Sequence, residues 1–423
     1  MQMWIALGIF VLTYVLLLTL TKIRSYVALC SAAVFVIIGI LPLSAVLAEI
    51  DWNVLMMIAG TMGTVALFID SKMPTLLADI LMDHVPNVKW AVIALSLFSG
   101  IVSAFVDNVA TVLMVAPVAL AISQKIKISP VPVIIAISVS SNLQGAATLV
   151  GDTTSILLGG YANMNFMDFF FFQGKMGMFW VVQIGAIAAT AMLLFLLRGM
   201  NQPVEAMEHT KVTDYFPSVL MVGTVVLLIL ASFIPEKPAV TNGVICVALF
   251  LIGLVRCMAQ KRSVAPLGHY MKEIDWQTLM LLAGLFVVIA GIREAGVIDA
   301  ISQLFVKMGS GNIFVIYTLI VWVSVLLSAF IDNIPYVATM LPVVANISAL
   351  LGVEPYLLFF GLLCGATLGG NLTPIGASAN ITGIGILRKE GYEVKNSDFL
   401  KIGVPFTLTA VITGYLLVWF LWS

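Results

Sequence analysis

Ser103–Val118 reads SAFVDNVATVLMVAPV, and Ser328–Val343 reads SAFIDNIPYVATMLPV. The two stretches align without a gap and are identical at eight of their sixteen positions. Each copy places an aspartate and an asparagine, Asp107–Asn108 and Asp332–Asn333, inside an otherwise apolar run. Ionisable residues are costly in hydrocarbon and by default indicate a functional site there. The duplicated Asp-Asn pair is therefore the predicted centre of function.

The composition is that of a protein embedded in a membrane. Of the 423 residues 61% are hydrophobic and only 10% are charged, and the mean hydropathy is +1.12. Soluble domains carry about 25% charged residues, so charges this sparse could not cover a water-exposed surface. The formal net charge of −1 argues against a nucleic-acid partner. We expect an all-α polytopic membrane protein in a lipid bilayer, with no cofactor.

A second pair of motifs has the same separation along the chain as the first pair. GAATLVGDTTSI, which begins at Gly145, aligns with GNLTPIGASANI, which begins at Gly370. Small and polar residues crowd the middle of each segment, and Pro374 in the second copy cannot continue a helix. The pattern predicts a broken helix in each half, over residues 130–162 and 355–387.

Two motif pairs at one separation predict an internal repeat, residues 1–210 and 211–423, with a re-entrant hairpin in each copy at 92–123 and 313–350. Residues 92–105 would rise about 21 Å as a helix, which is short of a hydrocarbon core of about 30 Å. With hairpins that enter and leave on one side, each half crosses the membrane about five times, and residues 26–43 are one of the expected full-length spans. Because five is odd, the second half starts on the opposite side, and the repeat is predicted to be inverted.

The distribution of positive charge orients this inverted repeat. Cytoplasmic loops of membrane proteins are enriched in Lys and Arg. Of the 20 Lys and Arg residues, four fall on one side in this arrangement, namely Lys175, Lys237, Arg293 and Lys307, and the rest fall on the other. The richer side is the predicted cytoplasm. Both termini are then predicted to lie outside a multi-pass protein of the cytoplasmic membrane.

The hairpin tips and the helix breaks are predicted to converge on one binding site at the membrane midplane. Inverted repeats with broken helices place solute and ion sites between the repeats. An interrupted helix offers free N–H groups to an anion, and its unwound oxygens can coordinate a cation. The predicted binding residues are Asp107, Asn108, Asp332, Asn333, Gly151, Asp152, Thr153, Thr154, Ser155, Thr373, Gly376, Ser378 and Asn380. The four tip residues are also the predicted ligands of a Na⁺ ion.

A structural role is the alternative interpretation of these residues. Aspartate is a favoured N-cap, and Pro335 suits the first turn of a helix, so Asp107 and Asp332 could serve only as caps. The small residues of the breaks could serve only close helix packing. Serine or asparagine would cap without burying an acid, however, so an acid in both copies favours ion binding. Asp152 ranks below the tip aspartates because its mate is Ala377.

With these motifs, the chain resembles members of the ion transporter superfamily, which has a citrate-transporter-like domain. The group includes arsenite pumps, an Na⁺/H⁺ antiporter family, divalent-anion/sodium symporters and the melanosomal P protein. SAFVDNVATVLMVAP and GAATLVGDTTSI are most similar to the P protein and its bacterial permease relatives. The resemblance implies a homodimer and an elevator-like movement of the hairpin domain.

The same resemblance also shows where this chain departs from its relatives. In the dicarboxylate branch the tips carry Ser-Asn-Thr, whereas here they read Asp107–Val109 and Asp332–Ile334, so only the asparagine carries over. The P-protein pattern after the first break is Gly-Asp-Pro-Pro-Asn, whereas this chain has Gly151–Ser155, which reads Gly-Asp-Thr-Thr-Ser.

The leading functional prediction is a secondary transporter, not an enzyme, that couples H⁺ or Na⁺ to the movement of a small anion or oxyanion-like solute. The alternatives are an Na⁺/H⁺ antiporter and an arsenite efflux permease. Aspartate at the tips favours the antiporter, because a carboxylate repels an anion unless a cation neutralises it. An intramembrane aspartyl protease is disfavoured, because its acids come from adjacent helices with their own signatures. A passive channel would not need a duplicated acid.

Two carboxylates in one desolvated pocket rarely stay ionised together, because burial and mutual repulsion both favour their neutral forms. No Lys or Arg lies within the tips or the breaks to neutralise them. We therefore expect Asp107 and Asp332 to bind a mobile H⁺ or Na⁺ and to contribute equivalently. The transport rate is predicted to vary with pH between about 5 and 8.

Overall fold

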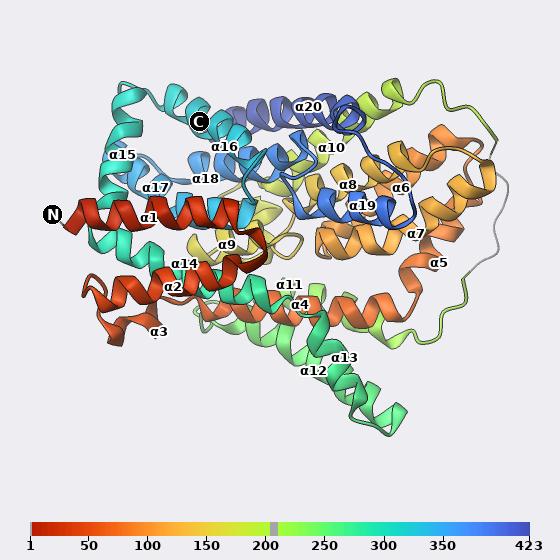
Figure 1. Cartoon of the computed structure of the whole chain (residues 1–423), viewed down its shortest axis with the longest axis horizontal. Coiled ribbons are helices and arrows are strands. Elements are labelled where there is room, and N and C mark those ends of the chain that lie inside the picture. The colour runs from red at the N-terminus through yellow and green to blue at the C-terminus, as the bar shows by residue number, and fades with distance from the viewer. Residues whose placement is uncertain (1, 204–209) are drawn as a thin grey trace.

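The computed structural model describes residues 2–203 and 210–423, and these are almost entirely helical (Figure 1). The helices of the first half are α1 (Gln2–Thr19), α2 (Arg24–Ile37), α3 (Val46–Glu49), α4 (Trp52–Asp70), α5 (Met73–Met82), α6 (Val88–Ser103), α7 (Asn108–Ile126), α8 (Val131–Gly145), α9 (Thr153–Tyr161) and α10 (Met178–Leu196). Those of the second half are α11 (Phe216–Ser232), α12 (Thr241–Lys261), α13 (Ala265–Glu273), α14 (Trp276–Glu294), α15 (Val297–Met308), α16 (Ile313–Ser328), α17 (Asn333–Leu351), α18 (Tyr356–Leu363), α19 (Ser378–Lys389) and α20 (Asn396–Trp422).

Short elements join these helices. They are the 3₁₀ turns η1 (Thr21–Ile23), η2 (Leu43–Ala45), η3 (Phe166–Phe169) and η5 (Gly370–Leu372), the π-helical turn η4 (Cys364–Leu368), and a small antiparallel hairpin of β1 (Phe171–Phe172) and β2 (Lys175–Met176). The boundary predicted between residues 210 and 211 adjoins residues 204–209, which lie outside the described part of the chain.

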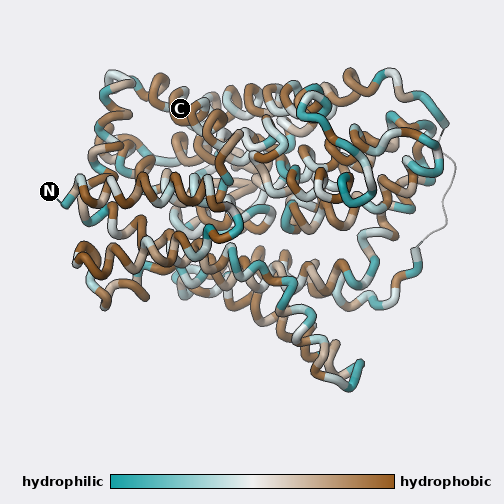
Figure 2. Tube along the Cα trace, viewed as in Figure 1, coloured by the Kyte–Doolittle hydropathy of each residue, from teal (hydrophilic) through white to brown (hydrophobic). Residues whose placement is uncertain are grey.

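Eight of the described helices are long and apolar enough to cross a membrane: α1, α4, α7, α10, α12, α14, α17 and α20. Figure 2 shows apolar residues along these helices and more hydrophilic residues in the turns. The predicted full-length span over residues 26–43 is wrong, because α2 ends at Ile37 after only 14 residues. Gly39 then takes a left-handed conformation with φ of 75°, which breaks the helix.

A pair of helices joined by a short turn occupies each predicted hairpin, and that these hairpins are re-entrant stays a prediction. In the first, α6 and α7 flank Asp107, and α7 continues to Ile126. In the second, α16 and α17 flank Asp332. The helices are interrupted within both segments predicted to be broken: α8 stops at Gly145 before α9 begins, and in the second half α18, η4 and η5 precede an interruption before α19.

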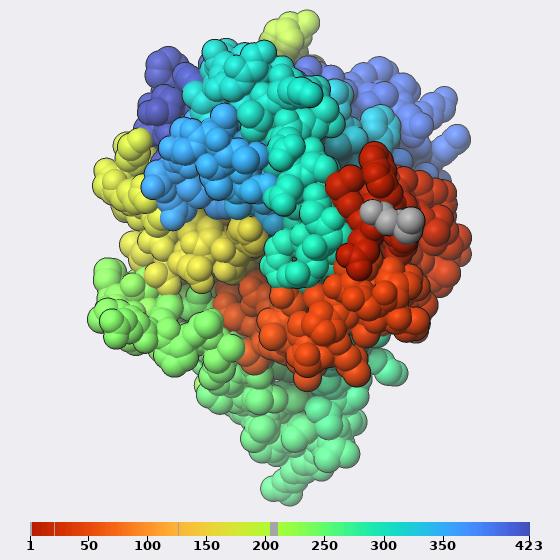
Figure 3. Space-filling model, turned by 90° about the vertical axis from the view of Figure 1, so that its left-hand side faces the viewer, coloured from red at the N-terminus to blue at the C-terminus, as the bar shows by residue number. Residues whose placement is uncertain are grey.

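The helices form two layers, which we name from Figure 1. The lower layer contains α2, α4, α11, α12 and α14, in which α4 packs on α12 and α2 packs on α14. The upper layer contains α6–α10 and α16–α20, in which α10 packs on α20 and α8 packs on α19. Each layer therefore draws on both halves of the chain. At the end of the molecule shown in Figure 3, first-half segments in red and orange lie directly beside second-half segments in cyan.

The two hairpins lie toward opposite ends of the long axis. In Figure 1, α6 and α7 are in the right half of the view and α16 and α17 are in the left half. The matching helices α4 and α14 have the same length of 19 residues, and they begin at equivalent positions of the two halves, Trp52 and Trp276. This is the arrangement that an inverted repeat produces, and the inverted topology itself stays a prediction.

The predicted topology can be tested at the two ends of α12, which rises about 31 Å over its 21 residues. In a variant without the four native cysteines, we expect Ser263→Cys to react with an impermeant maleimide only from the cytoplasm. Ala239→Cys is expected to react only from outside. Reaction of both sites from one side, or reversed sidedness at either, would contradict the inverted arrangement and its orientation.

Candidate functional site

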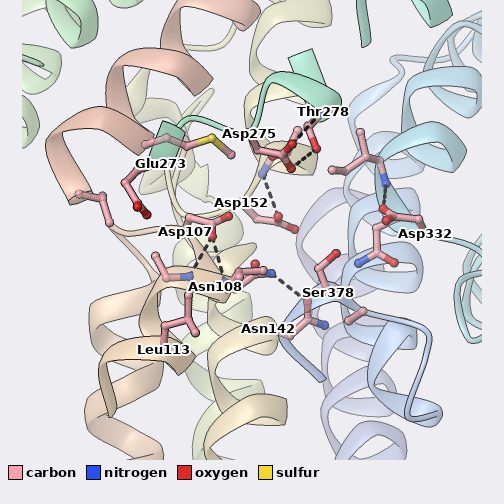
Figure 4. Close-up of a pocket in the computed structure, with 18 of the residues that line it drawn as sticks. Asp107, Asn108, Leu113, Asn142, Asp152, Glu273, Asp275, Thr278, Asp332 and Ser378 are labelled. Carbon is pink, nitrogen blue, oxygen red and sulfur yellow. Dashed lines mark hydrogen bonds between the residues drawn. The ribbon is translucent and has the colours of Figure 1, made fainter. Parts of the chain in front are cut away.

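A cavity of about 200 Å³ lies between the two layers and reaches both hairpin tips (Figure 4). Its walls come from α4, from the turn between α13 and α14, from the tips and from the two helix breaks. The lining residues are Met62, Val65, Ala66, Ile69, Asp107, Asn108, Val109, Ala110, Leu113, Asn142, Asp152, Thr153, Glu273, Asp275, Thr278, Asp332, Asn333, Ile334, Ala377 and Ser378. Glu273 and Asp275 are exposed, so the cavity opens on their side.

Asp107 caps α7 and also lines the cavity. Its Oδ2 atom accepts hydrogen bonds from the backbone N–H groups of Val109 at 3.0 Å and Ala110 at 3.1 Å. The predicted capping role is thus present, and it occupies one carboxylate oxygen. No Lys, Arg or His among the described residues forms an ion pair with Asp107. The other oxygen, Oδ1, takes no part in this cap.

Asp152 belongs to the same site, although its mate in the second half is an alanine. It caps α9, with Thr153 N–H donating to Oδ1 at 2.8 Å and the Thr154 hydroxyl donating to Oδ2 at 2.8 Å. Its side chain is buried within the protein. Asp107 and Asp152 also line a second, much smaller cavity of about 10 Å³, together with Thr61 and Gly151. A space of this size holds about one water molecule.

Asp332 is in a different environment from Asp107. One of its oxygens accepts the N–H of Ile334 at 3.1 Å, and the other accepts Nη1 of Arg24 at 2.6 Å. The expectation that both tip aspartates lack a fixed positive partner is therefore wrong for Asp332. Arg24 begins α2 and is remote from the tip in sequence, so a search of the tips and breaks alone misses it.

The tip asparagines orient the site through buried hydrogen bonds. Asn108 donates from Nδ2 to Oδ1 of Asn142 at 3.1 Å, and Asn142 donates in turn to the backbone carbonyl of Thr367 at 2.8 Å. This chain of bonds connects the first tip to the second half of the molecule. Asn333 accepts a short hydrogen bond from Ser328 at the end of its own first arm.

Several predicted binding residues hold the loops in place without lining the large cavity. Thr154 contacts the hydroxyl of Thr367 at 2.9 Å, Ser155 donates to the carbonyl of Gly145, Thr373 donates to the carbonyl of Ala329, and Asn380 donates to the carbonyl of Gly370. Gly151 and Gly376 pack against backbone carbonyls of the hairpins. Of the thirteen predicted residues, the large cavity brings together Asp107, Asn108, Asp152, Thr153, Asp332, Asn333 and Ser378.

Sequence reasoning missed Arg24 and Asn142. It also missed Glu273 and Asp275, which lie at the open side of the cavity and which we call its mouth. Asp275 lies in an Ile-Asp-Trp motif that occurs twice, at 50–52 and 274–276, and this repetition is a usable signal. Asn142 also had a signal, since it is an amide inside the apolar run before the first break. Arg24 had none, because a single arginine at the start of a short helix is an ordinary feature.

The walls of the cavity carry acidic side chains, and the N-termini of the helices that begin there add partial positive charge. Five carboxylates line it, from Asp107, Asp152, Glu273, Asp275 and Asp332, and the lining set contains no Lys, Arg or His. Four helices, α7, α9, α17 and α19, begin at the cavity, and helix N-termini carry partial positive charge. Of these four, only α19 has no side-chain cap, since Ala377 occupies its N-cap position.

The central asparagine gives a testable effect on stability. We expect Asn142→Ala to lower the thermal unfolding midpoint in detergent, because it leaves the carbonyl of Thr367 and the amide of Asn108 without these partners. Each buried group left unpaired costs about 1–3 kcal/mol. Asn346→Ala, which removes an exposed hydrogen bond to Asp299, is the control and should change the midpoint little. Equal midpoints for the two variants would show that the Asn142 network is not needed for stability.

Comparison with known proteins agrees with this architecture. The profile of a family described as "Citrate transporter" matches residues 14–364. An uncharacterized transporter of Mycobacterium tuberculosis is 31% identical over 428 residues, covering 98% of this chain and 97% of the relative. The human P protein is 26% identical over 473 residues, covering 92% of this chain and 56% of its own length.

Solved structures share the fold at low sequence identity. The YdaH transporter of Alcanivorax borkumensis superposes with a TM-score of 0.62 at 14% identity, covering 93% of this chain and 95% of that protein. MtrF of Neisseria gonorrhoeae, whose structure is described as illuminating a class of antimetabolite efflux pumps, gives a TM-score of 0.56 at 14% identity, covering 89% of this chain and 83% of that protein. The family profile, the transporter relatives and the fold agree that this is a multi-pass membrane transporter, and the chain belongs to the citrate transporter family.

Proposed function

We propose that the protein is a secondary active transporter of the cytoplasmic membrane that couples H⁺ or Na⁺ to the movement of a small anion or oxyanion-like solute. In this proposal Asp107 and Asp152 bind the coupling ion, and the solute occupies the larger cavity beside them. The observation that carries the proposal is that these two acids line one small cavity without forming an ion pair to any described Lys, Arg or His.

Asp152 is buried and Asp107 is partly buried, and carboxylates in such places without a fixed counter-charge favour a mobile cation. Leaving two like charges in a desolvated space is unfavourable, so a proton or Na⁺ is expected to bind there. Thr61 and Thr153 add hydroxyl oxygens to the same small cavity, and oxygen atoms are the ligands that hard cations prefer. The bound cation would neutralise the acids and thereby allow an anion to approach, which links the two binding events.

The uncapped end of α19 supports an anionic solute. Ser378 and Ala377 lie in the cavity wall, and α19 runs for 12 residues from that point. The first N–H groups of a helix have no partner within the helix, and together with the dipole they favour an anion. A carboxylate or oxyanion at this end would lie in the same cavity as the cation-binding acids.

One-sided access to the tips supports transport over static binding. A third cavity, of about 170 Å³, lies near Glu49 and Asp51. These residues belong to a Glu-Ile-Asp-Trp sequence at 49–52, and the same sequence occurs at 273–276 in the second half. The lining set of the third cavity contains neither tip, and Glu49 there forms an ion pair with Arg293 at 2.6 Å. Of the 200 Å³ cavity and the 170 Å³ cavity, only the first, which opens beside Asp275, reaches the tips. In the proposed topology this side is the cytoplasm, and a transporter would open the other side in turn.

An Na⁺/H⁺ antiporter is the second candidate, and the acidic lining favours it. Five carboxylates around one cavity suit cations better than an anion, because no side chain in the lining carries positive charge. In this function the two ions would compete for Asp107 and Asp152 without any further solute. The two candidates differ in whether ion movement requires an added anion.

The purified protein in sealed proteoliposomes separates these candidates. Uptake of citrate, a shorter dicarboxylate, phosphate and arsenite would be measured with an imposed pH gradient, with an inward Na⁺ gradient and with neither. We expect at least one anion to accumulate only when an ion gradient is present. Na⁺-driven proton movement without any of these solutes would support the antiporter, and arsenite movement alone would support an efflux permease. Equal uptake with and without gradients would refute the coupled mechanism.

A further inference from the structure

The two hairpin tips share a sequence motif but not an electrostatic environment. Asp332 forms an ion pair with Arg24, and the two side chains are only 20% and 31% exposed. Asp107 has no ion-pair partner among the described residues. Alignment of the two halves on the Ile-Asp-Trp motifs or on the Asp-Asn motifs matches Arg24 with Ala248 or with Leu249. The first tip therefore has no equivalent arginine.

The second tip is also held by a neighbouring helix. Tyr14 on α1 donates its hydroxyl to the carbonyl of Pro335 at 2.6 Å and lies 2.5 Å from the hydroxyl of Thr339, both on α17. Arg24 and Tyr14 come from consecutive helices and contact the same end of the second hairpin. The α1–α2 pair therefore fixes this tip, whereas the wall facing the first tip is the apolar side of α4 and the acidic mouth.

This asymmetry decides which acid can exchange a cation. A guanidinium keeps its charge at any physiological pH and matches a carboxylate in geometry. A proton or Na⁺ would have to displace Arg24 from Asp332, and it would leave a partly buried arginine without a partner. At Asp107 and Asp152 a cation displaces no charged partner among the described residues. The other titratable groups that line the cavity with Asp332 are Asp107 and Asp152 in the upper layer and Glu273 and Asp275 on the open side, and Tyr14 on α1 contacts α17 beside the tip.

We propose that Arg24 is a positioning residue that keeps Asp332 permanently paired, so that the coupling ion binds only at the first tip and first break, through Asp107 and Asp152. This inference rests on the proposed function, since it identifies which half of the site performs the coupling. It replaces the expectation of two equivalent acids with one exchanging acid site and one fixed ion pair.

A double-mutant cycle on Arg24 and Asp332 tests the inference. The variants are Arg24→Gln, Asp332→Asn and the double variant, with Arg24→Lys as the conservative change. The readouts are the ratio of coupling ions to solute, from reversal potentials in proteoliposomes, and the shift of the thermal unfolding midpoint with Na⁺ and with pH, which needs no solute. Each single variant leaves one partly buried charge alone and is expected to transport about 100-fold more slowly. The double variant should recover to within about tenfold of the natural protein.

The recovered double variant must keep the natural ion-to-solute ratio and the natural response of its midpoint to Na⁺ and pH. Arg24→Lys should keep both as well. A double variant that recovers but carries one ion fewer would overturn the inference, because Asp332 would then be a coupling site. A double variant as impaired as the single ones would overturn it too, since the two residues would then act separately. If the natural protein itself shows no response to Na⁺ or pH, the proposed function fails, which is a different result from either.

Discussion

Asp107→Asn is expected to lower ion-coupled transport by about 100-fold while the protein remains folded. Asparagine is as good an N-cap as aspartate, so the hydrogen bonds to Val109 and Ala110 at the start of α7 can persist. The change removes only the negative charge and the proton-binding group. The measurement is the initial rate of gradient-driven uptake, with the thermal unfolding midpoint as the test of folding.

Asp299→Asn is the control for this variant. Asp299 lies exposed in the first turn of α15 and lines neither the cavity that contains the tips nor the cavity near Glu49. The same chemical change at this position should leave the rate near its natural value. If Asp107→Asn also transports normally, Asp107 is only a cap, and the structural interpretation of the tips is correct.

Gly151→Ala is expected to destabilise the protein strongly and to abolish transport. A Cβ atom at this position would lie 2.6 Å from the carbonyl oxygen of Gly145 and 2.8 Å from those of Ser103 and Ala104. Contacts this short force the break away from the first hairpin. Overpacking of this kind costs about 1–3 kcal/mol or more. The same substitution at Gly376, which meets the equivalent carbonyls of the second half, should have a comparable effect.

Gly223→Ala provides the control, because an added Cβ there meets no atom within 4 Å. Gly223 lies inside α11, where alanine favours the helix by about 0.5–1 kcal/mol. We therefore expect the unfolding midpoint to fall for Gly151→Ala and to stay or rise for Gly223→Ala. Similar midpoints for the two variants would mean that the break can move away from the hairpin at little cost.

The sequence predicts the parts of this fold that repeat. The Asp-Asn motifs locate the hairpin tips and the Gly-Thr motifs locate the breaks, because polar and helix-breaking residues stand out in apolar segments. Helix ends are predicted less well. The span expected to reach residue 43 ends at Ile37, since hydropathy alone does not register the left-handed Gly39.

The site is predictable only to the extent that its residues share a local motif. Asp107, Asn108 and Asp152 are found in this way, and the cavity brings them together. Arg24 is not, because its importance comes from a contact with Asp332, which is far from it in the sequence. The expectation of two equivalent acids followed from the internal symmetry of the sequence. The helices that surround each tip do not share that symmetry, and the difference appears only in the folded chain.

The most direct test of ion coupling at Asp107 and Asp152 is the initial transport rate in sealed vesicles held without a membrane potential. The rate is measured first against pH at fixed Na⁺ and then against Na⁺ at fixed pH. We predict that the natural protein responds to at least one of the two ions, within about pH 5–8 if the ion is H⁺, and that Asp107→Asn responds to neither. A rate that is flat in both series for the natural protein would contradict coupling and would leave facilitated diffusion as the mechanism.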